Sequence, residues 1–149
     1  REKMPDIAVT TDLITGFPGE TEEMHRMTLD MLEKTQFDSA YTFIYSPRTG
    51  TPAARMEDQV PEKTKKRRLQ ELMAVENDIS LSINRRMEGH VYPIIAEGPT
   101  KNDPLNWYGR TSTNKMIVVG KDDAVSVGMT VDVRVDTAQT WILKGTLVK

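Results

Sequence analysis

The chain has 149 residues, a formal net charge of −2 and 28% charged residues, a composition typical of a globular protein rather than of a disordered or membrane-spanning one. The sequence contains no cysteine, which excludes disulfides and any thiolate ligand supplied by the chain itself. Its longest apolar runs are strand-sized and residues 1–5 do not resemble a secretion signal, so we expect a cytoplasmic protein that makes no membrane contact. The start in what looks like a helix tail indicates a piece of a longer polypeptide.

Residues 7–15 form an apolar run rich in β-branched side chains, which predicts a strand that ends in a turn containing Gly16 and Gly19. Glycine allows the main chain to approach a ligand more closely than a Cβ would permit, so this turn is a candidate ligand site. The turn alone is weak evidence, because two glycines can simply make a turn.

A helix is predicted to follow the turn, with Thr21 as its N-cap and its end near Lys34. On this helix His25 is expected to be exposed. The residues that share one helical face, and are therefore expected in the core, are Met24, Met27, Thr28, Met31 and Leu32.

A second strand is predicted over residues 39–45, followed by a loop over residues 46–52. Strand, helix and strand at this spacing form a βαβ unit, in which the two strands are parallel and their carboxyl-terminal loops meet at one edge of the sheet. Two unusual loops at one edge favour a pocket there.

Residues 61–88 predict one long helix or two abutting helices, with Gly89 placed to end the segment. The basic run over residues 63–68 could contact phosphate, but a solvated helix face is the favoured interpretation. The apolar positions expected to pack on one side are Leu69, Leu72, Met73, Ile79, Ile83 and Met87.

From His90 onward, five short predicted strands indicate a small antiparallel β-barrel, at residues 90–97, 107–111, 115–119, 130–137 and 141–149. Strict alternation over residues 131–136 predicts that the three valines face inward and that Asp132, Arg134 and Asp136 face outward. Barrels of this kind commonly present strands and loops to oligonucleotides, although the fold alone does not establish that use.

One loop of the predicted barrel carries groups that bind phosphates and 2′-hydroxyls, flanked by Trp107, Tyr108 and Met116. The second candidate patch contains Trp141 and Lys144, and Trp141 could equally well be a core residue. The candidate RNA-binding residues are Arg110, Thr111, Thr113, Asn114, Lys115, Trp141 and Lys144.

Residues 12–23 and 37–54 resemble the last part of the catalytic barrel of the radical S-adenosylmethionine methylthiotransferases, and the segment from about Glu88 resembles their TRAM domain, a small RNA-binding β-barrel. The resemblance implies an α/β plus all-β protein, with the carboxyl-terminal part of a partial (β/α) barrel followed by a five-stranded antiparallel, OB-like barrel. The expected domains are residues 1–60 (α/β part), 61–88 (connecting helix) and 89–149 (TRAM barrel).

Within this family, the loop after Arg110 favours the tRNA-modifying members, because residues 111–115 contain no acid, whereas members that modify a ribosomal protein have an acidic stretch there. The resemblance implies addition of a methylthio group to C2 of N6-isopentenyladenosine next to the anticodon, with the TRAM barrel bound to the anticodon stem-loop of tRNA. Two alternatives are a fragment of the ribosomal-protein enzyme and a non-catalytic RNA-binding module. The oligomeric state is open.

The resemblance also implies S-adenosylmethionine and two [4Fe–4S] clusters as cofactors, with both clusters ligated outside this chain, so the chain alone is predicted to be inactive. No catalytic residue and no metal ligand is expected here. Relative to the family motif, Glu20 lies one place late, which weakens a role for its side chain, and Arg48 is a candidate contact to substrate phosphate. The residues implied to contact the cofactor are Ile14, Gly16, Tyr45, Ser46 and Pro47.

Overall fold

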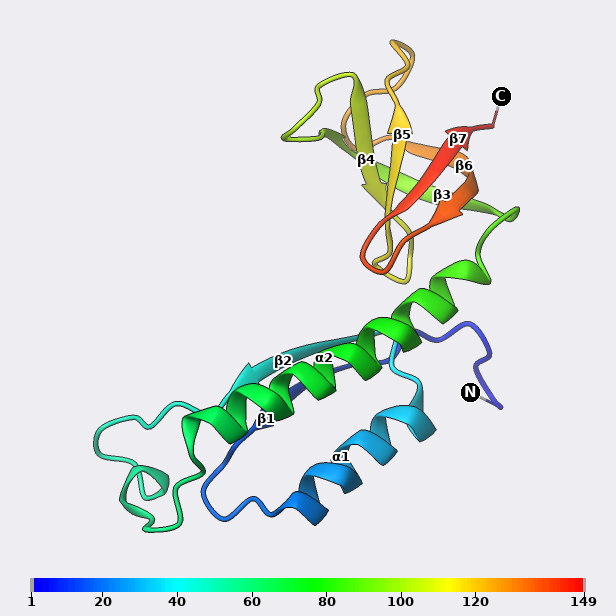
Figure 1. Cartoon of the computed structure of the whole chain (residues 1–149). Coiled ribbons are helices and arrows are strands. Elements are labelled where there is room, and N and C mark those ends of the chain that lie inside the picture. The colour runs from blue at the N-terminus through cyan, green and yellow to red at the C-terminus, as the bar shows by residue number, and fades with distance from the viewer. Residues whose placement is uncertain (1, 149) are drawn as a thin grey trace. The chain divides into compact units, whose positions relative to one another are not determined.

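The computed structural model describes residues 2–148, which divide into two compact units (Figure 1). One unit is Ala8–Ser80, and the other combines residues 2–7 with residues 81–148. Among the described residues, no helix has the length and apolar character needed to cross a bilayer.

The α/β unit contains strand β1 (Thr10–Thr15), helix α1 (Glu22–Thr35), strand β2 (Ser39–Ile44), the short 3-10 helix η1 (Ala53–Arg55) and most of helix α2 (Glu62–Arg85). Strands β1 and β2 pair in parallel, from Thr10 opposite Ser39 to Thr15 opposite Ile44. The predicted βαβ unit is therefore confirmed, with a first strand that begins three residues later than expected.

Helix α1 begins as predicted, because the Thr21 side chain accepts a hydrogen bond of 3.2 Å from the main-chain N–H of Met24. The predicted buried face is right for Leu32 and wrong for Met24 and Met27. His25 and Leu32 are fully buried, whereas Met24 and Met27 are exposed. The buried stripe includes His25, so a histidine that was expected in solvent lies in the core.

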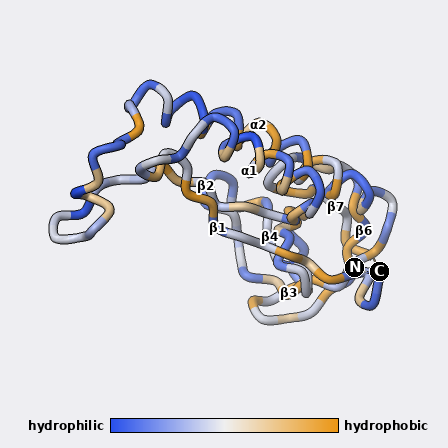
Figure 2. Tube along the Cα trace, turned by 90° about the horizontal axis from the view of Figure 1, so that it is seen from below, coloured by the Kyte–Doolittle hydropathy of each residue, from blue (hydrophilic) through white to orange (hydrophobic). Residues whose placement is uncertain are grey.

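Helix α2 is a single helix of 24 residues, which settles the choice between one helix and two. Leu72 and Ile79 are buried on its inner side as predicted, whereas Met73 is exposed. Hydrophobic and hydrophilic residues alternate along both helices (Figure 2), which is the pattern of helices buried on one side only.

The second unit is a closed five-stranded barrel with the strand order β3–β4–β5–β7–β6, which confirms the predicted barrel. One pairing differs from the all-antiparallel expectation, because β7 runs parallel to β5 where the barrel closes. The strands are β3 (Val91–Pro99), β4 (Asn106–Arg110), β5 (Met116–Gly120), β6 (Thr130–Ala138) and β7 (Leu143–Leu147).

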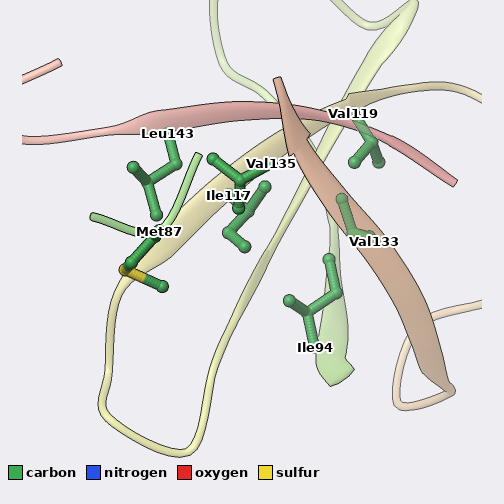
Figure 3. Close-up of a cluster of buried hydrophobic side chains, with 7 residues drawn as sticks. All are labelled: Met87, Ile94, Ile117, Val119, Val133, Val135 and Leu143. Atoms are coloured by element: carbon green, nitrogen blue, oxygen red, sulfur yellow. The ribbon is translucent and has the colours of Figure 1, made fainter. Parts of the chain in front are cut away.

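The core of the barrel is a cluster of buried aliphatic side chains (Figure 3). The alternation predicted for β6 is confirmed, since Val133 and Val135 are fully buried between exposed residues. Met87, just beyond the end of α2, joins this core. The buried members are Met87, Ile94, Ile117, Val119, Val133, Val135 and Leu143.

Candidate functional site

The loops at the carboxyl ends of β1 and β2 lie together, as the βαβ interpretation predicted. The main-chain N–H of Tyr45 donates a hydrogen bond of 2.8 Å to the carbonyl oxygen of Thr15. The ring of Phe17 meets the ring of Tyr45 edge to face, with centroids 5.1 Å apart. This edge of the sheet is the first candidate site.

One face of the two-stranded sheet presents apolar side chains to solvent. Ile14 is 60% exposed and lies directly opposite Phe43, which is 50% exposed. Tyr41 is exposed on the same face. In the loop that follows, Ser46 and Pro47 are exposed. An apolar, partly aromatic surface at the carboxyl ends of parallel strands can accept a planar base such as adenine.

Glu20 organises the turn after β1, a role that sequence analysis did not give it. Its Oε2 atom accepts hydrogen bonds from the main-chain N–H of Gly16, at 2.7 Å, and from Oγ1 of Thr15, at 3.3 Å. The same oxygen accepts a bond of 2.7 Å from Nη1 of Arg68, which also donates to the carbonyl oxygen of Glu20 at 2.9 Å. The Gly16 amide is therefore held by a side chain.

A second cation of α2 contacts the same region. Nζ of Lys65 donates to the carbonyl oxygen of Tyr45 at 3.3 Å and lies 3.0 Å from Oε1 of Glu62. The prediction of a solvated face for the basic run is wrong for Lys65 and Arg68, which are 2% and 4% exposed, although Lys63 and Lys66 are exposed. The one sequence signal for this burial was the spacing of Lys65, Arg68 and Leu72 at i, i+3 and i+7, which places all three on one face of the helix.

Around these contacts, opposite charges link the start of α1 to α2. Glu22 accepts hydrogen bonds from Nη2 of Arg67, at 2.7 Å, and from Nη2 of Arg68, at 3.2 Å. The Arg67 hydrogen bond is the main cause that holds the pKa of Glu22 below its ordinary value. The carboxylate of Glu22 is accordingly an ionised acceptor at neutral pH.

The chain supplies no thiolate ligand for an iron–sulfur cluster. The sequence has no cysteine, and within residues 2–148 no three histidine, aspartate or glutamate side chains group closely enough to hold a metal ion.

The second candidate site is the turn between β4 and β5. The main-chain N–H of Thr111 donates to the carbonyl oxygen of Lys115 at 3.0 Å, and Oγ1 of Thr111 accepts from the N–H of Lys115 at 3.1 Å and bonds to Oγ1 of Thr113 at 2.9 Å. Thr111 is buried, so its hydroxyl shapes the turn. Nη1 of Arg110 donates to Oδ1 of Asn114 at 3.2 Å.

The loop before β7 lies at the same end of the barrel as this turn, because β5 and β7 are parallel and both begin there, with Ile117 opposite Leu143. The two loops are visible in Figure 1. Nδ2 of Asn84 holds the loop by donating to the carbonyl oxygens of Gln139, at 2.8 Å, and Thr140, at 3.0 Å. Trp141 is 59% exposed, so the core alternative for this residue is wrong.

Lys144 lies on the outer face of the barrel rather than in a loop. It is exposed and lies opposite Val118, which in turn lies opposite Tyr108. Trp107 points the other way and packs against the barrel core. Tyr108, rather than Trp107, is therefore the aromatic residue that shares a face with Lys144.

Comparison with known proteins gives one family model, the TRAM domain, over residues 85–148. Three similar relatives are all named tRNA-2-methylthio-N(6)-dimethylallyladenosine synthase. The relative from Acetivibrio thermocellus is 52% identical over 100% of this chain and 31% of its own length. That from Carboxydothermus hydrogenoformans is 49% identical over 99% of this chain and 33% of its own length, and that from Bacillus subtilis is 45% identical over 99% and 29%.

The chain is homologous to the carboxyl-terminal region of these synthases. It spans about a third of the length of the relatives that it matches. This confirms the resemblance stated from the sequence, across both the α/β unit and the barrel. The TRAM domain begins at the last residue of α2 and includes all five barrel strands. Such a domain implies an RNA partner for the barrel.

A solved multidomain protein with nucleic acid binding domains from Streptococcus pneumoniae aligns with 42% of this chain and 23% of its own, at 14% identity and a TM-score of 0.34. That superposition is too partial to inform the fold.

Proposed function

We propose that this chain is the carboxyl-terminal part of a tRNA methylthiotransferase that adds a methylthio group to C2 of N6-isopentenyladenosine next to the anticodon. The observation that carries the proposal is the identity of about half of all residues to synthases of that name, over the whole chain. Since the chain is about a third as long as these relatives, activity requires the remaining two thirds as well.

The sheet edge fits S-adenosylmethionine. Ile14 and Tyr45 would flank the adenine, Gly16 would let the main chain approach the nucleoside, and Ser46 and Pro47 would line the rim. When bound, this cofactor supplies the radical chemistry of the reaction, and the chain's own residues orient it and exclude water. The clusters do not fit this chain, which has no thiolate, so the chain alone is inactive in the proposal.

At the barrel, Arg110, Lys115 and Lys144 would contact phosphates of the anticodon stem-loop, and Trp141 would stack on a base. Thr113 and Asn114 supply hydrogen-bonding groups on the turn, which Thr111 shapes from inside. An enzyme reaches C2 of a base in a folded RNA loop by extruding that base, so a second contact with the RNA stem is needed to hold the substrate. The absence of acid from residues 111–115 favours RNA over a basic protein substrate.

The proposal is tested with a chimera in which this chain replaces the matching 31% of the Acetivibrio thermocellus relative. We expect the chimera to methylthiolate isopentenylated tRNA in a strain that lacks the enzyme, as detected by mass spectrometry of digested tRNA. The intact relative is the positive control. Methylthiolation of a ribosomal protein instead, or no product although the chimera folds and holds both clusters, would contradict the proposal.

A further inference from the structure

Two positively charged side chains of α2 are buried in the α/β unit, although the charged side chains of a surface helix normally point into solvent. Lys65 and Arg68 are almost fully buried, whereas Lys63 and Lys66 of the same basic run are exposed. Withdrawing a charge from water is costly unless partners replace the water. Each of the two side chains therefore needs polar partners that replace the lost water. Arg68 finds partners in the loop after β1, and Lys65 finds one in the loop after β2.

Arg68 holds the loop after β1. Its guanidinium bonds to the carboxylate of Glu20, to the main-chain carbonyl of Glu20 and to the carboxylate of Glu22. The same Glu20 oxygen holds the N–H of Gly16, where the main chain has a positive φ of 77°. Removal of Arg68 would leave the carboxyl group of Glu20, whose side chain is only 13% exposed, without this partner.

Lys65 holds the loop after β2 and also contacts the first loop. Its ammonium group donates to the carbonyl oxygen of Tyr45 and lies 5.4 Å from the centroid of the Tyr45 ring. Its aliphatic stem packs against Gly16, since a Cβ built on that glycine would lie 2.4 Å from Cγ of Lys65. The two cations thus contact the main chain of both strand ends.

We propose that Lys65 and Arg68 are positioning residues for the cofactor site at this edge of the sheet, with Arg68 fixing the Gly16 turn and Lys65 fixing the Tyr45 loop against it. That a cofactor binds at this edge rests on the proposed function. A hydrophobic side chain could fill the same space, and replacing both members of a buried ion pair by hydrophobic residues is often neutral for stability. A hydrophobic side chain could not, however, donate a hydrogen bond to Glu20 or to the carbonyl oxygen of Tyr45. The contribution of the two cations is therefore to fix the geometry of the loops.

The test uses Arg68→Met and Lys65→Met in the chimera, with Lys66→Met as the matched control, because Lys66 is exposed on the same helix and loses the same charge. Two quantities are measured: the dissociation constant for S-adenosylmethionine by equilibrium dialysis, and hydrogen–deuterium exchange of each peptide. We expect both buried variants to weaken cofactor binding about tenfold or more, as small displacements in preorganised sites do.

The exchange pattern separates positioning from general destabilisation. Arg68→Met should raise exchange at residues 14–20, and Lys65→Met at residues 44–48 and at Gly16, while the barrel peptides and affinity for RNA stay unchanged. Arg68→Lys keeps the positive charge but replaces the guanidinium group, which bonds both Glu20 and Glu22, with a single ammonium nitrogen. Its exchange at residues 14–20 and its cofactor affinity should therefore lie between those of Arg68→Met and those of the wild type.

Cofactor affinity within twofold of wild type in both folded variants would overturn the proposal, as would exchange that rises equally across the α/β unit. If the methionine variants fail to fold, Glu20→Gln replaces them, since the amide can still accept from Gly16 but no longer pairs with the Arg68 charge. Exchange and cofactor binding do not depend on turnover. An unmodified chimera without activity would therefore count against the proposed function alone.

Discussion

Buried His25 on α1 and Glu71 on α2 share a hydrogen bond of 2.8 Å between Nε2 and Oε2. The other oxygen of Glu71 accepts a bond of 2.6 Å from Nη1 of Arg67, which is the larger cause of the lowered pKa of Glu71, with His25 contributing as well. An ionised carboxylate only accepts, so Nε2 carries the shared proton. A histidine thus occupies a core position because its partner comes from another helix.

Glu71→Gln should make the chain less stable at neutral pH and less sensitive to acid. The pKa of Glu71 is lower in the folded chain than its ordinary value of 4.5, so its stabilising effect is complete above that value and is lost as the pH falls through the lowered one. The side chain is 38% exposed, and after solvent screening we expect a loss of roughly 0.5–1 kcal/mol. Urea unfolding at about pH 7 and about pH 3.5 measures both effects; an equal decrease with acid in both proteins would contradict the prediction.

The elements with strict periodicity could be predicted from the sequence. Alternation placed Val133 and Val135 inside the barrel, and Thr21 was found as a cap because capping depends on neighbours a few residues away. The buried face of α1 could not be chosen, because two stripes fit the helical period. The stripe through Met24 and Met27 looked more apolar than the one through His25, whose partner is 46 residues away.

The candidate sites likewise contain features that could be predicted from the sequence and features that could not. The meeting of the two strand-end loops follows from chain topology, so it was predictable. The burial of Lys65 and Arg68 was not, because charged residues are rarely buried and their partners lie on other elements. The parallel pairing of β5 with β7 depends on barrel closure, a property of the whole unit.

Arg110→Ala and Lys115→Ala should each weaken binding of anticodon stem-loop RNA across sequences. If each side chain contacts one phosphate, the slope of log affinity against log salt should fall by about one for each substitution. Lys121→Ala is the control, because Lys121 follows β5 at the opposite end of the barrel from residues 111–115. Titrations at several salt concentrations give the slopes; an unchanged slope in both variants would remove these residues from the RNA surface.

Trp141→Ala should lower RNA affinity without changing the salt slope, because stacking on a base is not an ionic contact. The expected loss is about 1–3 kcal/mol of binding free energy. Trp141 is largely exposed, so its removal leaves no cavity in the barrel core, and thermal unfolding of the variant should match that of the unsubstituted chain. Quenching of tryptophan fluorescence by bound RNA, lost in the variant, is the second readout. Loss of stability in place of affinity would assign Trp141 a structural role.

Gly109→Ala and Gly145→Ala should destabilise the barrel, because neighbouring strands leave no room for a Cβ. An added Cβ would lie 2.4 Å from the carbonyl oxygen of Ile95 at Gly109, and 2.4 Å from that of Arg134 at Gly145. Main-chain atoms cannot move aside cheaply, so we expect a loss of about 1–3 kcal/mol or more. Gly120→Ala is the matched control, since no atom lies within 4 Å of its Cβ position. Urea unfolding that ranks all three alike would refute the close approach of these strands.

Gly16→Ala should cost more stability than Gly50→Ala, although both glycines have a positive φ, of 77° and 88°. Gly50 has open space around its Cβ position, so its substitution measures backbone strain alone, roughly 1–2 kcal/mol. At Gly16 the added carbon also meets the stem of Lys65, which adds an overpacking cost of about 1–3 kcal/mol. Lys65→Ala removes that stem, so the double variant Gly16→Ala, Lys65→Ala should be more stable than the sum of the two single effects predicts. If the changes in unfolding free energy are additive, the turn can move away from α2 when a Cβ is added. The helix would then not hold the turn in place.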